Sequence, residues 1–197
     1  MKNILLINSG KEFAESHGKL NDTLQEVAKE HLTGAGFIIQ ETLVDKGYEP
    51  EQEMQKILNA DILIHQFPGW WMAYPWITKK YIDEVFMHGF GKLFQSDGRH
   101  RVEPDINYGT GGLSHNKKYM LCSTWNAPLR AFEDSTQFFE GKGIDGVLFH
   151  MHKAHQFIGM KSLPSFMCND VVKAPNLQKY ISEYKNHLDK TIINSEK

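Results

Sequence analysis

Short apolar runs alternate along the chain with segments in which apolar residues recur every three or four positions. The first run, residues 2–8, is apolar at successive positions and is followed by the turn residues Ser9 and Gly10. A run that is apolar on both faces is typical of a strand buried in a parallel sheet. Runs of the same kind predict further strands at residues 37–43, 61–67, 118–124 and 165–169.

The segments between these runs show helical periodicity. In the first segment, one stripe with helical spacing contains Leu20, Leu24, Val27, Ala28 and Leu32. Later helices are predicted at residues 50–59, 77–86 and 177–188. Because strands alternate with helices, the pattern predicts an α/β fold in which helices cover both faces of a parallel sheet. We expect a single domain over residues 1–197.

Residues 87–116 interrupt this alternation. The segment is rich in glycine, carries several charges and shows no period of either kind. A long segment without periodicity is usually functional or is ordered by something outside its own domain. Two interpretations remain open. The segment is either a flexible loop or an arm that lies over a partner subunit or a ligand.

Composition narrows the classes of protein to which the chain can belong. The net charge is −2 and basic residues form no block, so nucleic acid is not expected as the main partner. No apolar run is long enough to cross a bilayer, and the first residues indicate a strand and no signal peptide. The widely spaced Cys122 and Cys168 form neither a metal pair nor a disulfide framework, which indicates a cytoplasmic protein.

The aromatic residues are unevenly distributed. They make up 12% of the chain, and Trp70, Trp71 and Trp76 lie close together in the loop Pro68-Gly69-Trp-Trp-Met-Ala-Tyr-Pro-Trp that follows the third strand. Ligands of open α/β sheets bind past the carboxyl ends of the strands. Exposed aromatic residues there indicate a binding surface, and a flat conjugated ring is a natural partner. The alternative is that Trp70 and Trp76 pack into the core, Trp76 at the start of the next helix.

Two further loops follow predicted strands. Residues 9–23 lead into a helix, and helix N-termini bind phosphate through free N–H groups. Ser16, Asn21 and Thr23 offer side-chain donors there, and Gly18 allows close approach. The alternative is ordinary helix capping by Asn21 or Thr23. The loop of residues 124–128 repeats the combination of tryptophan and proline, so two such loops are expected to line one flat cleft.

Two other patterns predict little chemistry. Gly141, Gly143 and Gly146 match G-x-G-x-x-G, but no strand precedes them, as a dinucleotide site requires. The cluster His150, His152 and His155 lacks nearby acidic or cysteine ligands, so a polar surface or contact with a ligand is favoured over a metal site. Ser123 lacks the flanking glycines of a hydrolase nucleophile.

Six stretches of the chain resemble one family. They are SxGxLNDT at 16–23, PGWWMAYPW at 68–76, KKYIDEVF at 79–86, YGTGGL at 108–113, KKYMLCSTWNAP at 117–128 and FHMHKAHQFIGM at 149–160. Together they resemble the modulator of drug activity B branch of the flavodoxin-like NAD(P)H:quinone oxidoreductases, over essentially the whole chain.

The resemblance implies a flavodoxin-like fold with five strands in the order 2-1-3-4-5, FAD as cofactor, and a homodimer with active sites at the subunit interface. It implies that the phosphates and ribityl chain of FAD contact Ser16, His17, Gly18, Lys19, Leu20, Asn21 and Thr23. It implies that the flavin ring is framed by Pro68, Gly69, Trp70, Trp71, Met72, Thr124, Trp125, Asn126 and Ala127. Tyr108 would contact the flavin from its own or the neighbouring subunit.

The activity implied is two-electron reduction of a quinone to a quinol by NADPH, in a ping-pong reaction whose chemistry occurs at the flavin N5. Trp70, Trp71 and Tyr74 would form the flat substrate site, and backbone N–H groups near Asn126 and Ala127 would stabilise negative charge. The proton could come from water, a histidine or Tyr108. The chain lacks the histidine after strand one and the paired glycines after strand four of the wider family, so no catalytic acid is assigned.

Two other functions remain as alternatives. One is a non-enzymatic flavodoxin-like electron carrier or regulatory subunit, although short-chain flavodoxins are usually strongly acidic. The other is a hydrolase on a similar sheet.

Overall fold

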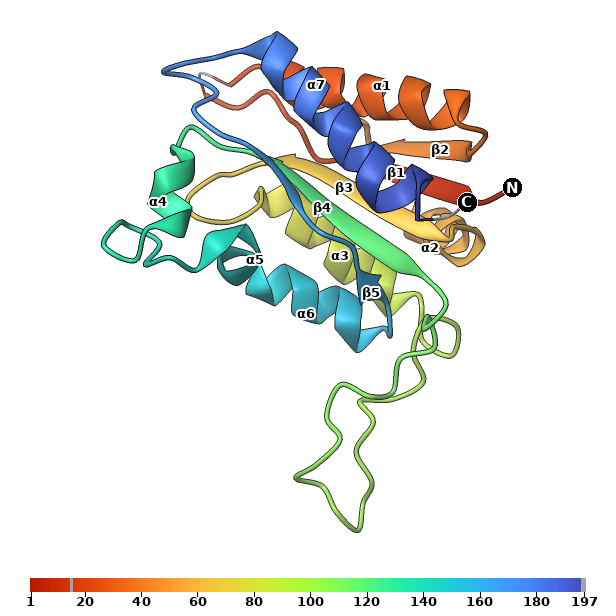
Figure 1. Ribbon diagram of the computed structural model, residues 1–197. Coiled ribbons are helices and arrows are strands. Elements are labelled where there is room, and N and C mark those ends of the chain that lie inside the picture. The colour runs from red at the N-terminus through yellow and green to blue at the C-terminus, as the bar shows by residue number, and fades with distance from the viewer. Residues whose placement is uncertain (15, 196–197) are drawn as a thin grey trace.

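A parallel β-sheet forms the centre of the molecule in the computed structural model, which describes residues 1–14 and 16–195 (Figure 1). Its strands are β1 (Asn3–Asn8), β2 (Ile38–Leu43), β3 (Ile62–Pro68), β4 (Lys118–Thr124), β5 (Lys161–Ser162) and β6 (Phe166–Cys168). The order is β2-β1-β3-β4-β5, with β6 also beside β4. The flavodoxin-like strand order and the parallel sheet are therefore confirmed.

The fifth position of the sheet holds two short strands where one was predicted. β5 pairs with the start of β4 and β6 with its end. Pro164 lies between them and has no N–H to donate to β4, so the ladder is broken there. The predicted strand at 165–169 corresponds to β6, and the pattern missed β5 because two polar residues show no period.

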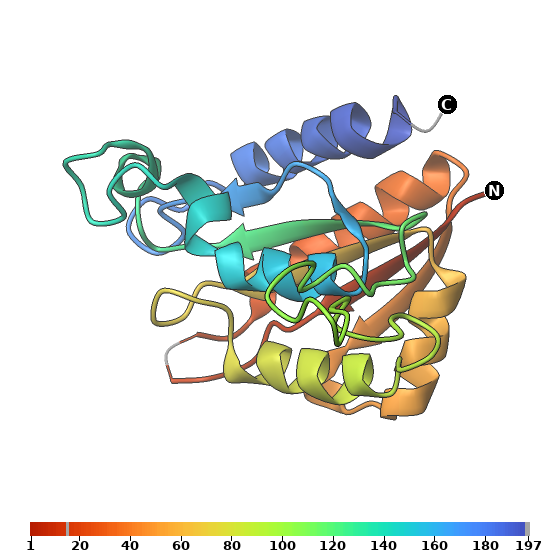
Figure 2. The same cartoon turned by 90° about the horizontal axis from the view of Figure 1, so that it is seen from below.

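Helices cover both faces of the sheet, as predicted (Figures 1 and 2). They are α1 (Lys19–Gly34), α2 (Pro50–Asn59), α3 (Trp76–Met87), α4 (Leu129–Glu133), α5 (Gly143–Val147), α6 (Phe149–Phe157) and α7 (Leu177–Leu188), with short turns at Val44–Lys46 and Asp189–Ile193. The pattern did not predict α4, α5 or α6. None of the described helices combines the length and apolar composition needed to cross a bilayer.

The continuous apolar run of β1 follows from this layering. Ile4 and Leu6 pack into the core beneath α1 and α7, whereas Leu5 and Ile7 pack into the core on the other face, with α2, α3 and α6. All four are almost completely buried. Burial on both faces removes the polar alternation that a half-exposed strand would show.

The glycine-rich segment forms an arm of residues 88–117 that extends away from the sheet (Figure 1). Its base is fixed to the rest of the fold, because Leu93 is fully buried and its carbonyl accepts from the Leu113 N–H at 2.7 Å. Gly112 lies so close to Gly159 that a Cβ at Gly112 would stand 2.3 Å from the Gly159 nitrogen. The arm leaves the fold where β4 begins, so its base lies opposite to the carboxyl ends of the strands.

Two buried histidines join β3 to α6. Their Nε2 atoms, on His65 and His155, lie 2.9 Å apart, and the Nδ1–H of His155 donates to the Met151 carbonyl at 2.8 Å. The Nε2 of His155 is therefore the acceptor for an N–H of His65. Within the described part of the chain, the buried Nδ1 of His65 has no hydrogen-bond partner.

Burial keeps both rings neutral. It lowers the pKa of His155 to about 4, and the charge of His152 adds to the effect, against the bond to Met151. Burial, and then the electrostatic influence of His155, hold the pKa of His65 well below its usual value of 6.5. Each lowered pKa makes protonation unfavourable for the folded chain.

The histidine pair predicts a loss of stability in mild acid. As the pH falls from 6.5 to about 4, His155 becomes protonated in the unfolded chain but stays neutral in the folded chain. The free energy of unfolding therefore decreases. The loss approaches about 3 kcal/mol for His155 alone. The double variant His65→Leu, His155→Leu should show a flatter dependence when urea unfolding is compared at about pH 7.5 and about pH 5. The exposed His88→Gln serves as control, and an unchanged slope in the double variant would contradict the assignment.

Candidate functional site

Three loops meet at the carboxyl ends of β1, β3 and β4. The loop after β1 touches the loop after β3 where the rings of Phe13 and Trp70 lie 4.9 Å apart. The loop after β3 is joined to β4 by the Gly69 N–H, which donates to the Thr124 carbonyl at 2.8 Å. The sheet therefore brings together segments that are far apart in the sequence.

A chain of buried side-chain hydrogen bonds lies beneath these loops. The Gln66 amide donates to the Asn21 Oδ1 at 2.8 Å, and the Asn21 Nδ2 donates to the Thr124 hydroxyl at 3.3 Å. All three side chains are buried, so they fasten α1 to β3 and β4. The sheet thereby fixes the position of the first turn of α1.

That first turn is not capped by a side chain. Gly18 is the N-cap residue at a φ of 70°, which glycine adopts readily, and no side chain bonds to the cap. The predicted alternative of capping by Asn21 or Thr23 is therefore wrong, because the Thr23 hydroxyl donates within the helix to the Lys19 carbonyl. Among the described residues, no backbone carbonyl accepts from the N–H of Lys19 or Leu20. These two N–H groups lie at the positive end of the helix dipole, an arrangement that suits an anion.

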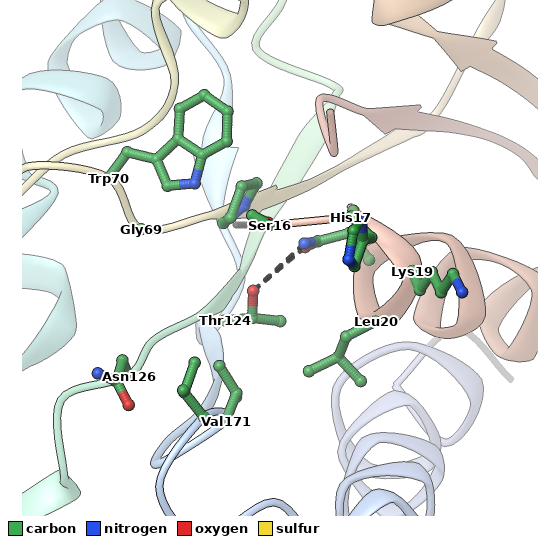
Figure 3. Close-up of a pocket in the computed structure, with 13 residues that line it drawn as sticks. Ser16, His17, Lys19, Leu20, Gly69, Trp70, Thr124, Asn126 and Val171 are labelled. Atoms are coloured by element: carbon green, nitrogen blue, oxygen red, sulfur yellow. Dashed lines mark hydrogen bonds between the residues drawn. The ribbon is translucent and has the colours of Figure 1, made fainter. Parts of the chain in front are cut away.

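A hollow of about 380 Å³, here called the cofactor hollow, opens beside this helix end (Figure 3). It is lined by Ser16, His17, Gly18, Lys19, Leu20, Asn21, Pro68, Gly69, Trp70, Thr124, Asn126, Val171 and Val172. Among the described residues of this lining, none carries a carboxylate and one is a lysine. Free N–H groups at one end and an indole ring at the other fit a ligand that carries both a phosphate and a flat ring. These residues therefore fit a flavin.

A second hollow, here called the apolar slot, adjoins the first. Its volume is about 290 Å³, and it shares Gly69 and Asn126 with the cofactor hollow. It is lined by Gly69, Trp71, Met72, Trp125, Asn126, Ala127, Ala131, Phe138 and Phe139. No charged side chain lies in this lining, so the slot suits a neutral apolar group.

Trp125 forms the inner wall of the apolar slot and is itself almost fully buried, at 4% exposure. Its indole N–H donates to the Ser123 hydroxyl at 2.9 Å, and its ring packs edge-on against Phe132 at 5.2 Å. A Cβ at Gly69 would stand 2.3 Å from the ring. Only glycine at this position lets the loop after β3 lie against Trp125.

The loop after β3 ends in a tight turn that holds its largest side chain in solvent. Trp70 and Ala73 exchange two backbone hydrogen bonds, of 2.8 and 3.0 Å, around Trp71 and Met72. These central residues have φ values of 44° and 65°. Two-residue turns with positive φ at both positions favour Asn-Gly, and a bulky residue there is strained. Trp71 is nonetheless 92% exposed.

The remaining aromatic residues of this loop lie elsewhere. Trp76 begins α3 as predicted, but the prediction that it packs into the helix is wrong: it is 58% exposed, and the Lys11 ammonium lies 5.9 Å from its ring centroid. Tyr74 is half-buried and contacts Phe67 and His150, with ring centroids 6.2 and 5.0 Å away. Tyr74 and Thr23 lie outside both hollows.

Tyr108 lies on the arm, away from both hollows. Its ring is 70% exposed and lies 5.7 Å from that of Phe157, the last residue of α6. The opposite end of α6 is the one near Tyr74, through His150. The structure therefore does not bring Tyr108 to the site of its own chain.

A third hollow, here called the polar hollow, lies on the other side of His17 and Gly18, which it shares with the cofactor hollow. Its volume is about 230 Å³, and it is lined by Asn8, Gly10, Lys11, Glu12, His17, Gly18, Asp22, Leu43, Asp45 and Lys46. The Lys11 ammonium bonds to the Asp45 carboxylate there. The surroundings of His17 and Gly18 are therefore open on two sides.

The glycine and histidine patterns noted in the sequence lie in or beside α5 and α6. Gly143 begins the five-residue helix α5 with no strand before it, as predicted. In α6, His155 is buried against His65, and His152 lies 2.8 Å from the Tyr119 hydroxyl and 3.2 Å from Asp145. His150 is exposed. Within residues 1–14 and 16–195, no three His, Cys, Asp or Glu side chains could hold a metal ion.

Sequence reasoning missed five lining residues. Val171 and Val172 complete the cofactor hollow, and Ala131, Phe138 and Phe139 complete the apolar slot. The adjacent phenylalanines in a polar stretch were the available signal. The valines gave no signal in the sequence. Val171 is held at the site because its N–H donates to the Trp125 carbonyl, and this hydrogen bond joins segments that are distant along the chain.

Comparison with known proteins identifies a family and a similar protein that cover nearly the whole chain. The family model described as flavodoxin-like fold matches residues 2–191. NADPH:quinone oxidoreductase MdaB from Haemophilus influenzae is 53% identical over 188 residues, covering 95% of this chain and 98% of that protein.

Two solved structures share the fold. One is a proposed quinone reductase from Klebsiella pneumoniae, with a TM-score of 0.73, 24% identity, and coverage of 96% of this chain and 85% of that one. The other is general stress protein 14 from Treponema denticola in complex with FMN, with a TM-score of 0.63, 16% identity and coverage of 99% of both chains. At these identities the likeness establishes the fold alone.

The strained backbone of this turn predicts that a better-suited pair of residues would raise the stability of the chain. Replacing Trp71 by Asn and Met72 by Gly should raise the free energy of unfolding by about 1–2 kcal/mol, because Asn-Gly suits positive φ and Trp71 loses little packing. Urea unfolding of the double variant measures the gain. Trp76→Asn, which removes an exposed tryptophan at a helical position, is the matched control. A double variant less stable than the parent chain would show that the turn is held by packing and not strained.

Proposed function

The chain belongs to the flavodoxin-like fold family, in the modulator of drug activity B branch, and we propose that it is a flavin-dependent NADPH:quinone oxidoreductase. The observation that carries the proposal is the pair of adjoining hollows at the carboxyl edge of the sheet. One combines an anion site with an aromatic ring, and the other is apolar. A phosphorylated flavin and a neutral quinone require this combination.

The residues of the cofactor hollow would hold the flavin by two kinds of contact. The N–H groups of Lys19 and Leu20, with Ser16 and His17, would bind its phosphate. Trp70 would lie against its ring. A flavin bound there supplies two-electron transfer from NADPH to a quinone, with the two substrates using one place in turn, as a ping-pong reaction requires.

The turn after β4 offers fixed dipoles for negative charge. Asn126 and Ala127 lie between β4 and α4, and no backbone carbonyl of the described residues accepts from their N–H groups. The turn is held in place by the Asn169 amide, which donates to the Ala127 carbonyl at 3.2 Å. Preorganised N–H groups stabilise developing charge without reorganisation. We assign them to a reduced, negatively charged ring.

The cofactor we propose is FAD. The polar hollow supports this choice, because it shares His17 and Gly18 with the cofactor hollow and offers polar space beyond the phosphate site. The AMP half of FAD needs such space and FMN does not. FMN is the alternative, since the T. denticola protein of the same fold was solved with FMN.

A homodimer would explain the arm. It carries large exposed apolar side chains, including Phe90, Val102, Ile106 and Tyr108, and a second copy of the chain would cover them. Tyr108 is remote from its own site, so we propose that it contacts the flavin and quinone of the partner subunit. It is then a candidate proton donor, along with water.

We place the protein in the cytoplasm. Cys122 and Cys168 are both free and buried, and unpaired thiols are typical of a reducing compartment.

The apolar slot favours an enzyme over an electron carrier, because a carrier needs no space for a substrate beside its cofactor.

Three measurements on one preparation test the proposal. The purified protein should reduce menadione steadily with NADPH, more efficiently than with NADH. Heat should release FAD, identified by chromatography and mass spectrometry, and light scattering should give twice the mass of one chain. A colourless protein that does not bind added FAD or FMN would refute the proposal. Release of FMN would correct the cofactor alone.

Trp70→Ala should separate cofactor binding from folding. Loss of one stacked ring should weaken flavin binding about threefold to tenfold. Because Trp70 is only partly buried, the free energy of unfolding of the apoprotein should fall by less than about 1 kcal/mol. Trp76→Ala, outside the cofactor hollow, should leave flavin binding unchanged. Equal losses of binding and stability in Trp70→Ala would make Trp70 a core residue.

A further inference from the structure

The apolar slot is a hollow of about 290 Å³ beside the cofactor hollow, and aromatic side chains form much of its wall. Its inner wall is built from the buried Trp125 and from Phe139, which stacks on Phe132 at 4.3 Å. Its outer edges are Trp71, Met72 and Phe138, all exposed. The inner wall is fixed by packing, whereas the side chains of the outer edges remain exposed to solvent.

The chemistry of the lining limits the occupant. Among the described lining residues, Asn126 alone has an amide side chain and none is charged, so the phosphates of NADPH or of a flavin would lose hydration there without gaining a cationic partner. The slot connects with the cofactor hollow through Gly69 and Asn126. A molecule that reacts beside the flavin can therefore extend an apolar substituent into the slot.

The turn that carries Trp71 is a second, independent observation. Asn-Gly would suit its backbone better, yet the chain places two large apolar side chains at its positive φ positions. Strain of this kind is found at ligand-binding sites. Trp71 and Phe138 come from different loops and line the same hollow.

We propose that the apolar slot binds the hydrocarbon side chain of the quinone acceptor, so the preferred substrates are quinones with an alkyl or prenyl chain. This inference rests on the proposed function and adds the substrate class. Phe138 is the residue that discriminates, because it lines the slot and does not line the cofactor hollow. Its 70% exposure makes it replaceable without loss of the core.

The test compares menadione, which has no side chain, with the same naphthoquinone head carrying a short prenyl chain. Steady-state kinetics with NADPH give kcat/KM for each, and the ratio of prenylated quinone to menadione is the readout. Phe138→Ala should lower that ratio about fivefold to tenfold, mainly through KM of the prenylated quinone. Its kcat/KM for menadione should fall much less than its kcat/KM for the prenylated quinone.

Two further variants sharpen the result. Ala131→Leu adds volume inside the slot and should lower the same ratio by blocking the chain. Phe149→Ala removes an exposed phenylalanine outside the slot and should leave the ratio unchanged. Both are compared with the parent chain at equal flavin content.

Several results would overturn the proposal. An unchanged ratio in Phe138→Ala and Ala131→Leu would show that the slot does not bind the chain. Equal losses with both quinones would place Phe138 in the headgroup or cofactor site. A shift of Phe138→Ala from dimer to monomer, or lost binding to phosphatidylglycerol vesicles at an unchanged ratio, would assign the slot edges to a second copy or a lipid surface. Menadione turnover without discrimination refutes this inference alone, whereas no turnover of any quinone refutes the proposed function as well.

Discussion

The contact between the Trp125 ring and the backbone of Gly69 sets the geometry of the whole carboxyl edge. Trp125 continues β4 and Gly69 continues β3, so the contact fixes how closely the loops after these strands approach each other. The ring is oriented by the Ser123 hydroxyl behind it and by Phe132 beside it. With that ring in place, one side of the loop pair faces the end of α1 and the other faces Phe138 and Phe139. The cofactor hollow and the apolar slot are the spaces that remain on the two sides.

The polar contacts beneath this edge also fix its geometry, through hydrogen bonds between side chains. Gln66, Asn21 and Thr124 form a buried row of hydrogen bonds, which fixes α1 against the sheet without using the first N–H groups of the helix. A side-chain cap would have occupied those N–H groups. The absence of such a cap at Gly18 leaves them available to a phosphate.

The fold gives up stability in two places, and only the first of them lies in the site. At Trp71 and Met72 the backbone adopts positive φ with bulky side chains, so local conformational energy is given up for an apolar surface at the mouth of the site. At His65 and His155 the fold buries ionisable rings as neutral groups, which stabilises the chain at neutral pH and weakens it in acid. The first feature lies in the site. The second joins β3 to α6, so protonation of these histidines destabilises the core.

The sequence by itself determined the layers of the fold and where the site lies. Runs that are apolar at successive positions, such as residues 3–8, are typical of strands covered on both faces, and the motif resemblance supplied the strand order. Local pattern also located the loops after β1, β3 and β4. It could not assign Trp76 to solvent or Trp125 to the core, because burial depends on which distant residues meet each ring. It missed Phe138 and Val171 for the same reason, and it left open whether a side chain caps α1. Tertiary structure decided those points, since a hollow is bounded by side chains from several loops whose distances are set by packing and not by neighbours along the chain.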